Sequence, residues 1–161
     1  MGQGQRGNPR RIRRSHELSG LLFDTSLYIE SRRAHRPGLL DPHDYPGQPI
    51  YLSAVVGHEL YVGAVERPER RFVDRLWTRF ERAGRLLVPS ASDWLNAGLV
   101  IQEIAQQRGY ELVGRARLTN DALLAMSAWR LGMIVLTLNA RDFSLLASNR
   151  PFHWAVPEGV T

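Results

Sequence analysis

The sequence contains no cysteine and no lysine, and it has no long apolar run. Without cysteine, disulfide bonds, thiolate metal ligands and a cysteine nucleophile are excluded together, and a reducing cytoplasm is the expected location. No stretch of roughly 18 uncharged apolar residues is present, so we expect no membrane span. The basic start is followed only by the short apolar stretch 18–23, which Ser19 and Gly20 interrupt, so we expect no secretion signal.

Because lysine is absent, all 21 basic residues are arginine, and with 16 acidic residues they give a net charge of +5. The planar guanidinium group binds phosphate through two hydrogen bonds, so this composition favours a polyanionic partner such as RNA or DNA. Codon bias in a GC-rich genome and ordinary solubilising charge explain the same composition equally well. The charge alone therefore does not establish nucleic-acid binding.

A chain of 161 residues, of which 43% are hydrophobic, is the size of one compact domain with a single core. Residues 1–19 contain five arginines and almost no apolar residue, which predicts a flexible basic tail. We therefore assign residues 20–161 to one domain.

Short apolar runs alternate with amphipathic segments along this domain. We expect strands at 21–23, 49–52, 86–88, 133–138 and 153–156, helices at 27–31, 53–65, 68–82, 92–108, 120–131 and 141–147, and a loop at 32–48. We expect Ser92 to cap the fourth of these helices and Leu95, Leu99, Ile101 and Ile104 to point mostly inward. The alternation predicts an α/β sandwich with a mostly parallel sheet.

Four acidic residues occupy special places in this pattern. Asp24 and Asp142 come shortly after apolar strands, at the edge where open parallel sheets bind ligands. Glu59 and Asp121 share helix faces with apolar residues, where an unpaired carboxylate is costly to bury. Carboxylates that converge at one sheet edge repel one another unless a hard divalent cation neutralises them, and ligands that are all oxygen favour Mg²⁺ or Mn²⁺. Such a site suits hydrolysis of a phosphodiester by metal-activated water.

Each acid also has a structural explanation. Asp24, Asp121 or its neighbour Asn120 can cap a helix, and Asp142 can favour the positive end of a helix that Asn139 caps. Glu59 can be solvated or form a salt bridge. Capping explains the four acids one at a time, whereas a shared site explains why they recur at strand ends and on apolar helix faces.

Hydroxyl and amide side chains lie next to these acids in the sequence. Thr25, Ser26, Thr137 and Asn139 are expected to fix carboxylate rotamers and to hold metal-bound water, although capping and turn formation are equally good explanations. The five histidines show no ligand spacing, and His58 is expected at the surface, so no zinc site is predicted. No glycine-rich loop follows the first strand, which argues against a dinucleotide or ATP site.

Four segments together resemble the PIN-domain family and, within it, the VapC toxins of VapBC toxin–antitoxin pairs. They are residues 23–26 (Phe-Asp-Thr-Ser), 53–63 around Glu59, 118–125 around Asp121 and 136–143 (Leu-Thr-Leu-Asn-Ala-Arg-Asp-Phe), and they follow one another in the family's order. The resemblance implies a Rossmann-like α/β/α sandwich in which Asp24, Glu59, Asp121 and Asp142 are catalytic and hold Mg²⁺, with Mn²⁺ as an alternative. It also implies cleavage of RNA, a homodimer, and inhibition by a VapB-like antitoxin whose tail enters the site.

Two other functions are compatible with the sequence. One is a PIN nuclease that acts in RNA maturation or on DNA. The other is a non-catalytic, arginine-rich nucleic-acid-binding module in which the acids only cap helices.

Overall fold

The structure is a computed structural model that describes residues 20–34, 40–109, 111 and 116–158. The predicted basic tail, residues 1–19, lies outside the described residues. No helix in the described part of the chain is long and apolar enough to cross a membrane.

Five short strands form one sheet, and all neighbouring strands run parallel. They are β1 (Leu21–Phe23), β2 (Ile50–Ser53), β3 (Leu86–Leu87), β4 (Ile134–Leu136) and β5 (His153–Ala155). Their order in the sheet is β3-β2-β1-β4-β5, so the chain winds in one direction from β1 to β3 and in the other from β4 to β5. The reversal lies between β1 and β4, and ligands of open parallel sheets bind at the carboxyl ends of the strands at such a point.

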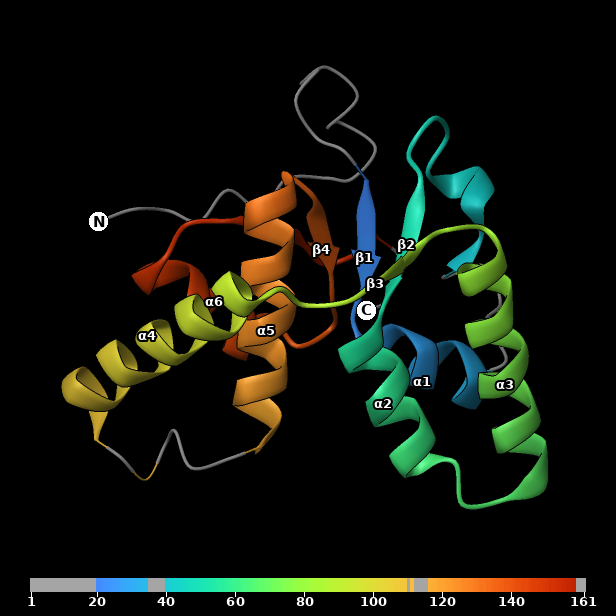
Figure 1. The fold of residues 1–161 in the computed structure, drawn as a ribbon, viewed down its shortest axis with the longest axis horizontal. Helices are drawn as coiled ribbons and strands as arrows, with labels where there is room; N and C mark the ends of the chain where they lie inside the picture. Colours follow the sequence, from blue (N-terminus) through green and yellow to red (C-terminus); the bar gives the residue numbers. More distant parts are fainter. Residues whose placement is uncertain (1–19, 35–39, 110, 112–115, 159–161) are drawn as a thin grey trace.

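The helices form two groups on either side of the strands (Figure 1). The first group contains α1 (Thr25–Arg33), α2 (Ala54–Gly63) and α3 (Arg67–Arg82), and a short 3-10 helix, η2 (Pro42–Asp44), precedes β2. The second group contains α4 (Ala91–Arg108), α5 (Ala116–Leu131) and α6 (Ala140–Asn149), which all contact one another. This arrangement confirms the predicted α/β/α sandwich with a parallel central sheet.

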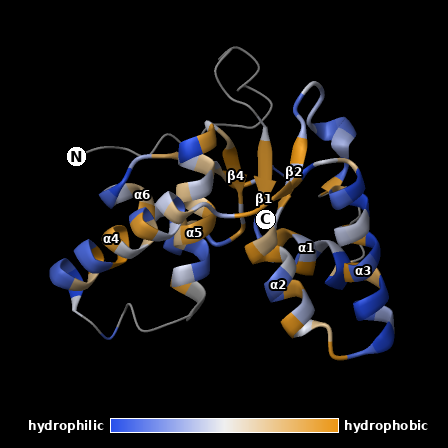
Figure 2. Ribbon diagram, in the orientation of Figure 1, coloured by the Kyte–Doolittle hydropathy of each residue, from blue (hydrophilic) through white to orange (hydrophobic). Residues whose placement is uncertain are grey.

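The core follows the apolar strands through the centre of the molecule (Figure 2). Every residue of β1 and β4 is buried, as expected for parallel strands that are covered on both faces. Helix α5 is buried from Asp121 to Ala128, so it is the central helix of its group. A carboxylate therefore lies at the start of the buried part of this helix.

The structure corrects several predicted boundaries. Helix α1 begins directly after Asp24 and ends at Arg33, so the predicted loop 32–48 begins within a helix. Helix α5 begins at Ala116, about one turn before the predicted start at residue 120. Neither Asn120 nor Asp121 therefore caps this helix, and the capping explanation for Asp121 is wrong.

The prediction for helix α4 was also partly wrong. Ser90, not Ser92, caps it: the Ser90 hydroxyl accepts from the Asp93 amide, and the Asp93 carboxylate accepts from the Ser90 amide at 2.8 Å. Leu95 and Leu99 are 64% and 43% exposed, although both were predicted inward. The buried residues of α4 are Asp93, Ala97, Val100 and Ile104, so the inward position predicted for Ile104 is confirmed. They recur at intervals of three or four residues and form the face of a helix that contacts α5 and α6.

Candidate active site

Asp24 follows β1 at the reversal of strand order and is only 4% exposed. Its Oδ2 accepts hydrogen bonds from the Ser26 hydroxyl at 2.6 Å and from the Thr137 hydroxyl at 2.8 Å. These hydroxyls in turn accept from the backbone amides of Leu138 (3.0 Å) and Asn139 (2.9 Å), so their protons are directed towards the carboxylate. Asp24 also caps α1, because its carboxylate accepts from the backbone amide of Ser26. The predicted cap is therefore present, and the same carboxylate is also held by the two hydroxyls.

Glu59 lies on α2, half-buried between the buried Val56 and Leu60. The Thr25 hydroxyl donates to its Oε2 and the Asn120 amide donates to its Oε1 at 2.9 Å. Glu59 thus faces α1 and α5 and makes neutral contacts there, and among the described residues it has no arginine partner. The salt-bridge explanation for Glu59 is therefore not realised within the described part of the chain.

Asp121 and Asp142 share one donor. The side-chain amide of Asn139 donates to Asp121 Oδ2 at 3.0 Å and to Asp142 Oδ2 at 2.8 Å. Asn139 precedes α6 at the cap position but makes no capping hydrogen bond with its side chain. Its amide instead lies between two carboxylates, one buried on α5 and one in the first turn of α6.

These contacts join all four predicted acids into one network. Thr25, which contacts Glu59, is the neighbour of Asp24 in the chain, and Asn120, which also contacts Glu59, is the neighbour of Asp121. Asn139 links Asp121 and Asp142 through its side chain and reaches Asp24 through Thr137. The structure therefore brings Asp24, Glu59, Asp121 and Asp142 to one place, at the carboxyl edge of β1 and β4.

Asn120 is the residue of this network that the sequence did not reveal. The sequence predicts Asn120 only as a possible helix cap, because the predicted helix begins at residue 120 and α5 begins at Ala116. With the helix starting at Ala116, Asn120 lies within it and its side chain reaches Glu59. Only its position directly before Asp121 indicates, in the sequence, that Asn120 lies near the acids.

The donor set of this network fits a hard divalent cation in its chemistry. The four acids provide only oxygen, and every hydrogen-bond partner of the buried Asp24 within the described residues is a neutral hydroxyl or amide. As the side chains lie, however, no group of three or more histidine, aspartate or glutamate residues in the described ranges could hold a metal ion. The amide of Asn139 occupies the space between Asp121 and Asp142, so metal ligation by the quartet stays a prediction.

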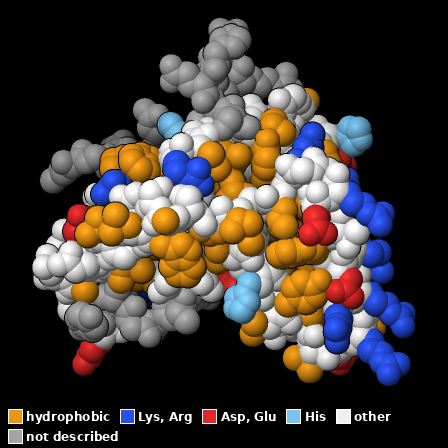
Figure 3. Space-filling view, viewed as in Figure 1, with side chains coloured by type: hydrophobic (Ala, Val, Ile, Leu, Met, Phe, Trp, Pro, Cys, Tyr) orange, Lys and Arg blue, Asp and Glu red, His pale blue; other side chains and the backbone are white. Residues whose placement is uncertain are grey.

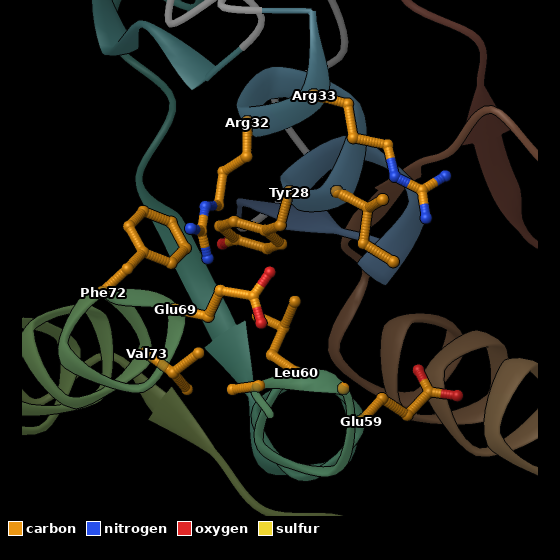
Figure 4. A pocket seen from close by; sticks show the side chains of 11 residues that line it. Tyr28, Arg32, Arg33, Glu59, Leu60, Glu69, Phe72 and Val73 are labelled. Atoms are coloured by element: carbon orange, nitrogen blue, oxygen red, sulfur yellow. The ribbon is translucent and has the colours of Figure 1, made fainter. Parts of the chain in front are cut away.

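A cavity of about 420 Å³ opens beside Glu59, between α1, α2 and α3 (Figure 4). Glu59 lies at one side of it, with its carboxylate turned away from the Tyr28 ring. Arg32 and Arg33 of α1 line the cavity, and the Arg32 guanidinium lies 4.8 Å from the centre of the Phe72 ring. Further arginines project from α3 along one edge of the molecule (Figure 3). Positive charge therefore lies close to the acidic network.

No family model and no curated protein match this sequence. Solved structures do match. The chain is similar to a chain of the DNA-bound VapBC structure from Salmonella typhimurium, with 18% identity and a TM-score of 0.65 over 86% of this chain and 98% of that one. For VapBC2 from Rickettsia felis bound to a DNA fragment from the promoter, the identity is 17% and the TM-score 0.65, over 84% and 97% of the two chains.

A chain of VapBC-1 from nontypeable Haemophilus influenzae is also similar, with 20% identity and a TM-score of 0.64 over 84% of this chain and 96% of that one. At such low identity the likeness establishes the fold, over nearly the full length of the matched chains. The predicted PIN-like, Rossmann-like architecture is thereby confirmed.

Proposed function

We propose that this PIN-fold protein is a metal-dependent endoribonuclease and the toxin half of a VapBC-type toxin–antitoxin pair. The observation that carries the proposal is the network that joins four acids at the strand-order reversal, where parallel sheets bind their ligands. Caps alone do not explain this convergence, because only Asp24 of the four caps a helix.

Asp24, Glu59, Asp121 and Asp142 would hold Mg²⁺ or Mn²⁺. When bound, such a cation lowers the pKa of water and neutralises charge on a phosphate. Ser26 and Thr137 fix the Asp24 carboxylate, since both donate to the same oxygen. Arginines of α1 and α3 bind flanking phosphates of the RNA, because the guanidinium fork matches phosphate geometry.

Metal-dependent cleavage is the direct test. Purified protein should cleave single-stranded or loop-containing RNA with Mg²⁺ or Mn²⁺ and stop on addition of EDTA, because four carboxylates need a hard cation to act together. Gel analysis of end-labelled RNA measures the cleavage, and re-addition of the metal should restore it. Cleavage that chelation does not reduce would refute the metal mechanism.

The same assay separates the other two functions. A single-stranded DNA of the same sequence, cleaved as fast as the RNA, would indicate a nuclease of broader substrate range. RNA binding without cleavage under any metal would indicate a binding module that uses its arginines alone.

The partner in this proposal is a small VapB-like antitoxin. The similar structures named above are VapBC assemblies, which supports a second protein as the partner of this chain. Co-expression with the product of the adjacent gene should give one complex on size-exclusion chromatography, with RNA cleavage suppressed. A neighbouring gene product that neither binds nor inhibits would contradict the toxin assignment and leave the nuclease assignment in place.

A further inference from the structure

Asn120 contacts the acidic network from α5, and no step of the proposed function uses it. Its side-chain amide donates to Glu59 Oε1 at 2.9 Å, and the Thr25 hydroxyl donates to the other carboxylate oxygen. Figure 4 shows this carboxylate turned away from Tyr28 and Phe72, as the contact with α5 requires. Both oxygens of Glu59 are therefore held, one by each group of helices.

Helix stability does not explain an asparagine at this position. Helix α5 begins at Ala116, so Asn120 lies in its second turn, where asparagine is less favourable than alanine, leucine or glutamate. Asparagine disfavours helix interiors because its side chain competes for backbone hydrogen bonds, whereas this side chain donates to a different helix, α2. The contact with Glu59 accounts for the residue, since it joins α2 to α5 beside the acids.

The same contact connects two of the four acids. Asn120 and Asp121 are consecutive in α5, so their side chains point about 100° apart around the helix axis. One side chain reaches Glu59 on α2, and the other accepts from Asn139 at 3.0 Å. A short, rigid piece of α5 therefore fixes how far apart the carboxylates of Glu59 and Asp121 lie.

The donors to Glu59 are neutral, which matters for binding a cation. A hydroxyl and an amide orient a carboxylate without cancelling its charge, and they leave about two of its four lone-pair sites open. Asp93 provides a contrast within the same chain, because its carboxylate accepts from the Arg130 guanidinium at 2.7 and 2.8 Å. An arginine neutralises Asp93, whereas Glu59 keeps its charge available for a cation.

We infer that Asn120 is a positioning residue, which holds the Glu59 carboxylate at a fixed distance and orientation relative to Asp121 so that both bind the same divalent cation. This role rests on the proposed function, because it requires a metal at the four acids. A glutamate side chain rotates about several bonds, and a ligand that is fixed in advance loses less conformational freedom when the cation binds. Loss of a residue that orients a metal ligand lowers metal affinity or activity about 10- to 100-fold.

Manganese binding tests this role without any turnover. Isothermal titration calorimetry of the full chain with Mn²⁺ alone should give an affinity about tenfold lower for Asn120→Ala than for wild type. In a Glu59→Gln chain the same substitution should cause no further loss, because Asn120 acts through the Glu59 carboxylate. Asn96→Ala is the control: Asn96 is a half-buried asparagine of α4 that donates to the Ser92 carbonyl oxygen, and its replacement should leave Mn²⁺ binding unchanged.

Cleavage kinetics separate positioning from RNA binding and from folding. At the Mn²⁺ concentration that half-saturates wild type, Asn120→Ala should lower kcat about 10- to 100-fold and leave KM for RNA unchanged. Excess Mn²⁺ should restore much of the rate, since the defect lies in metal affinity. Asn120→Gln keeps an amide donor on a longer side chain, so its rate should lie between those of Asn120→Ala and wild type, and it replaces Asn120→Ala if that variant does not fold.

Several results would overturn the inference. One is an Asn120→Ala protein with the Mn²⁺ affinity and kcat of wild type, and another is an additive loss of affinity in the double variant. A fall in kcat that excess Mn²⁺ does not restore, together with a lower melting temperature, would show that Asn120 is only structural. A wild type that cleaves no RNA with any metal would refute the nuclease and this role with it, whereas a wild-type-like Asn120→Ala would refute the role and leave the nuclease in place.

Discussion

Asn139 keeps two carboxylates close that would otherwise repel each other. Its amide donates to both Asp121 and Asp142, while its backbone amide orients Thr137 towards Asp24. One residue thus contacts three parts of the acidic network, and neutral donors partly offset the repulsion between the acids. The arrangement is consistent with a site in which a cation and Asn139 stabilise the same negative charge.

Amide variants of the acids distinguish catalysis from structural support. Asp24→Asn, Glu59→Gln, Asp121→Asn and Asp142→Asn should each reduce RNA cleavage by about 100-fold or more, because each removes a charged oxygen ligand. The melting temperature should stay the same or rise, since asparagine caps helices as well as aspartate and one repelling charge is lost. RNA cleavage rates and melting temperatures, measured on the same preparations of each variant, test both expectations.

Asp74→Asn is the matched control, because Asp74 is an exposed acid on α3 whose carboxylate accepts a hydrogen bond from the Tyr61 hydroxyl and takes no part in the acidic network. It should retain full cleavage. If Asp24→Asn and Asp121→Asn also retain it, the acids are structural and the nuclease assignment loses its main support.

At the scale of the element, α4 and α5 are joined by an ion pair in which the carboxylate of Asp93 is buried and the side chain of Arg130 is partly exposed. Asp93 of α4 is 1% exposed and accepts hydrogen bonds from Arg130 (2.7 and 2.8 Å) and Ser127 (3.1 Å) of α5. Burial would raise the pKa of Asp93, but the hydrogen bonds from Arg130, Ser90 and Ser127 outweigh it and hold this pKa below its usual range. The ionised form therefore stabilises the packing of the two helices.

This pKa shift predicts how stability depends on pH. A carboxylate with a lowered pKa in the folded state contributes stability above its unfolded pKa, about 3.9, and loses that contribution as the pH falls through the folded value. Denaturant unfolding should therefore show wild type losing its advantage over Asp93→Asn below about pH 4. At pH 7 the variant should be less stable by about 2 kcal/mol, since the cap and the ion pair both weaken. A difference that stays constant from pH 7 to pH 2 would contradict the assignment.

The elements also show what the sequence predicts and what it does not. Strands β1 and β4 are predictable because fully buried parallel strands are short apolar runs, and the position of Asp24 at the end of β1 follows from the same pattern. The start of α5 was missed because it carries no capping signal, and this error hid the contact between Asn120 and Glu59. The sequence does not predict the outward position of Leu95 and Leu99, because apolar residues lie on several faces of α4 and tertiary packing decides that the face with Ala97 and Val100 is buried.

At the scale of the whole molecule, apolar side chains gather on the face over α4 (Figure 3), the helix that carries the exposed leucines. Trp94, Leu95 and Leu99 are 57%, 64% and 43% exposed, and Val88 just before the helix is 66% exposed. Exposed apolar groups gathered in this way mark interaction surfaces. We therefore expect the predicted homodimer to form through α4.

Disruption of this surface should separate the subunits without unfolding them. Leu95→Arg places a charge where a second copy would bury an apolar group, so light scattering coupled to size-exclusion chromatography should show a monomer where wild type is a dimer. Because Leu95 is 64% exposed, its replacement leaves the core of the single chain intact, and circular dichroism should be unchanged. Val65→Arg is the control: Val65 is 89% exposed and lies between α2 and α3, so this variant should stay dimeric. A Leu95→Arg protein that remains a dimer would place the interface elsewhere, and a wild type that is monomeric at all concentrations would refute the predicted homodimer.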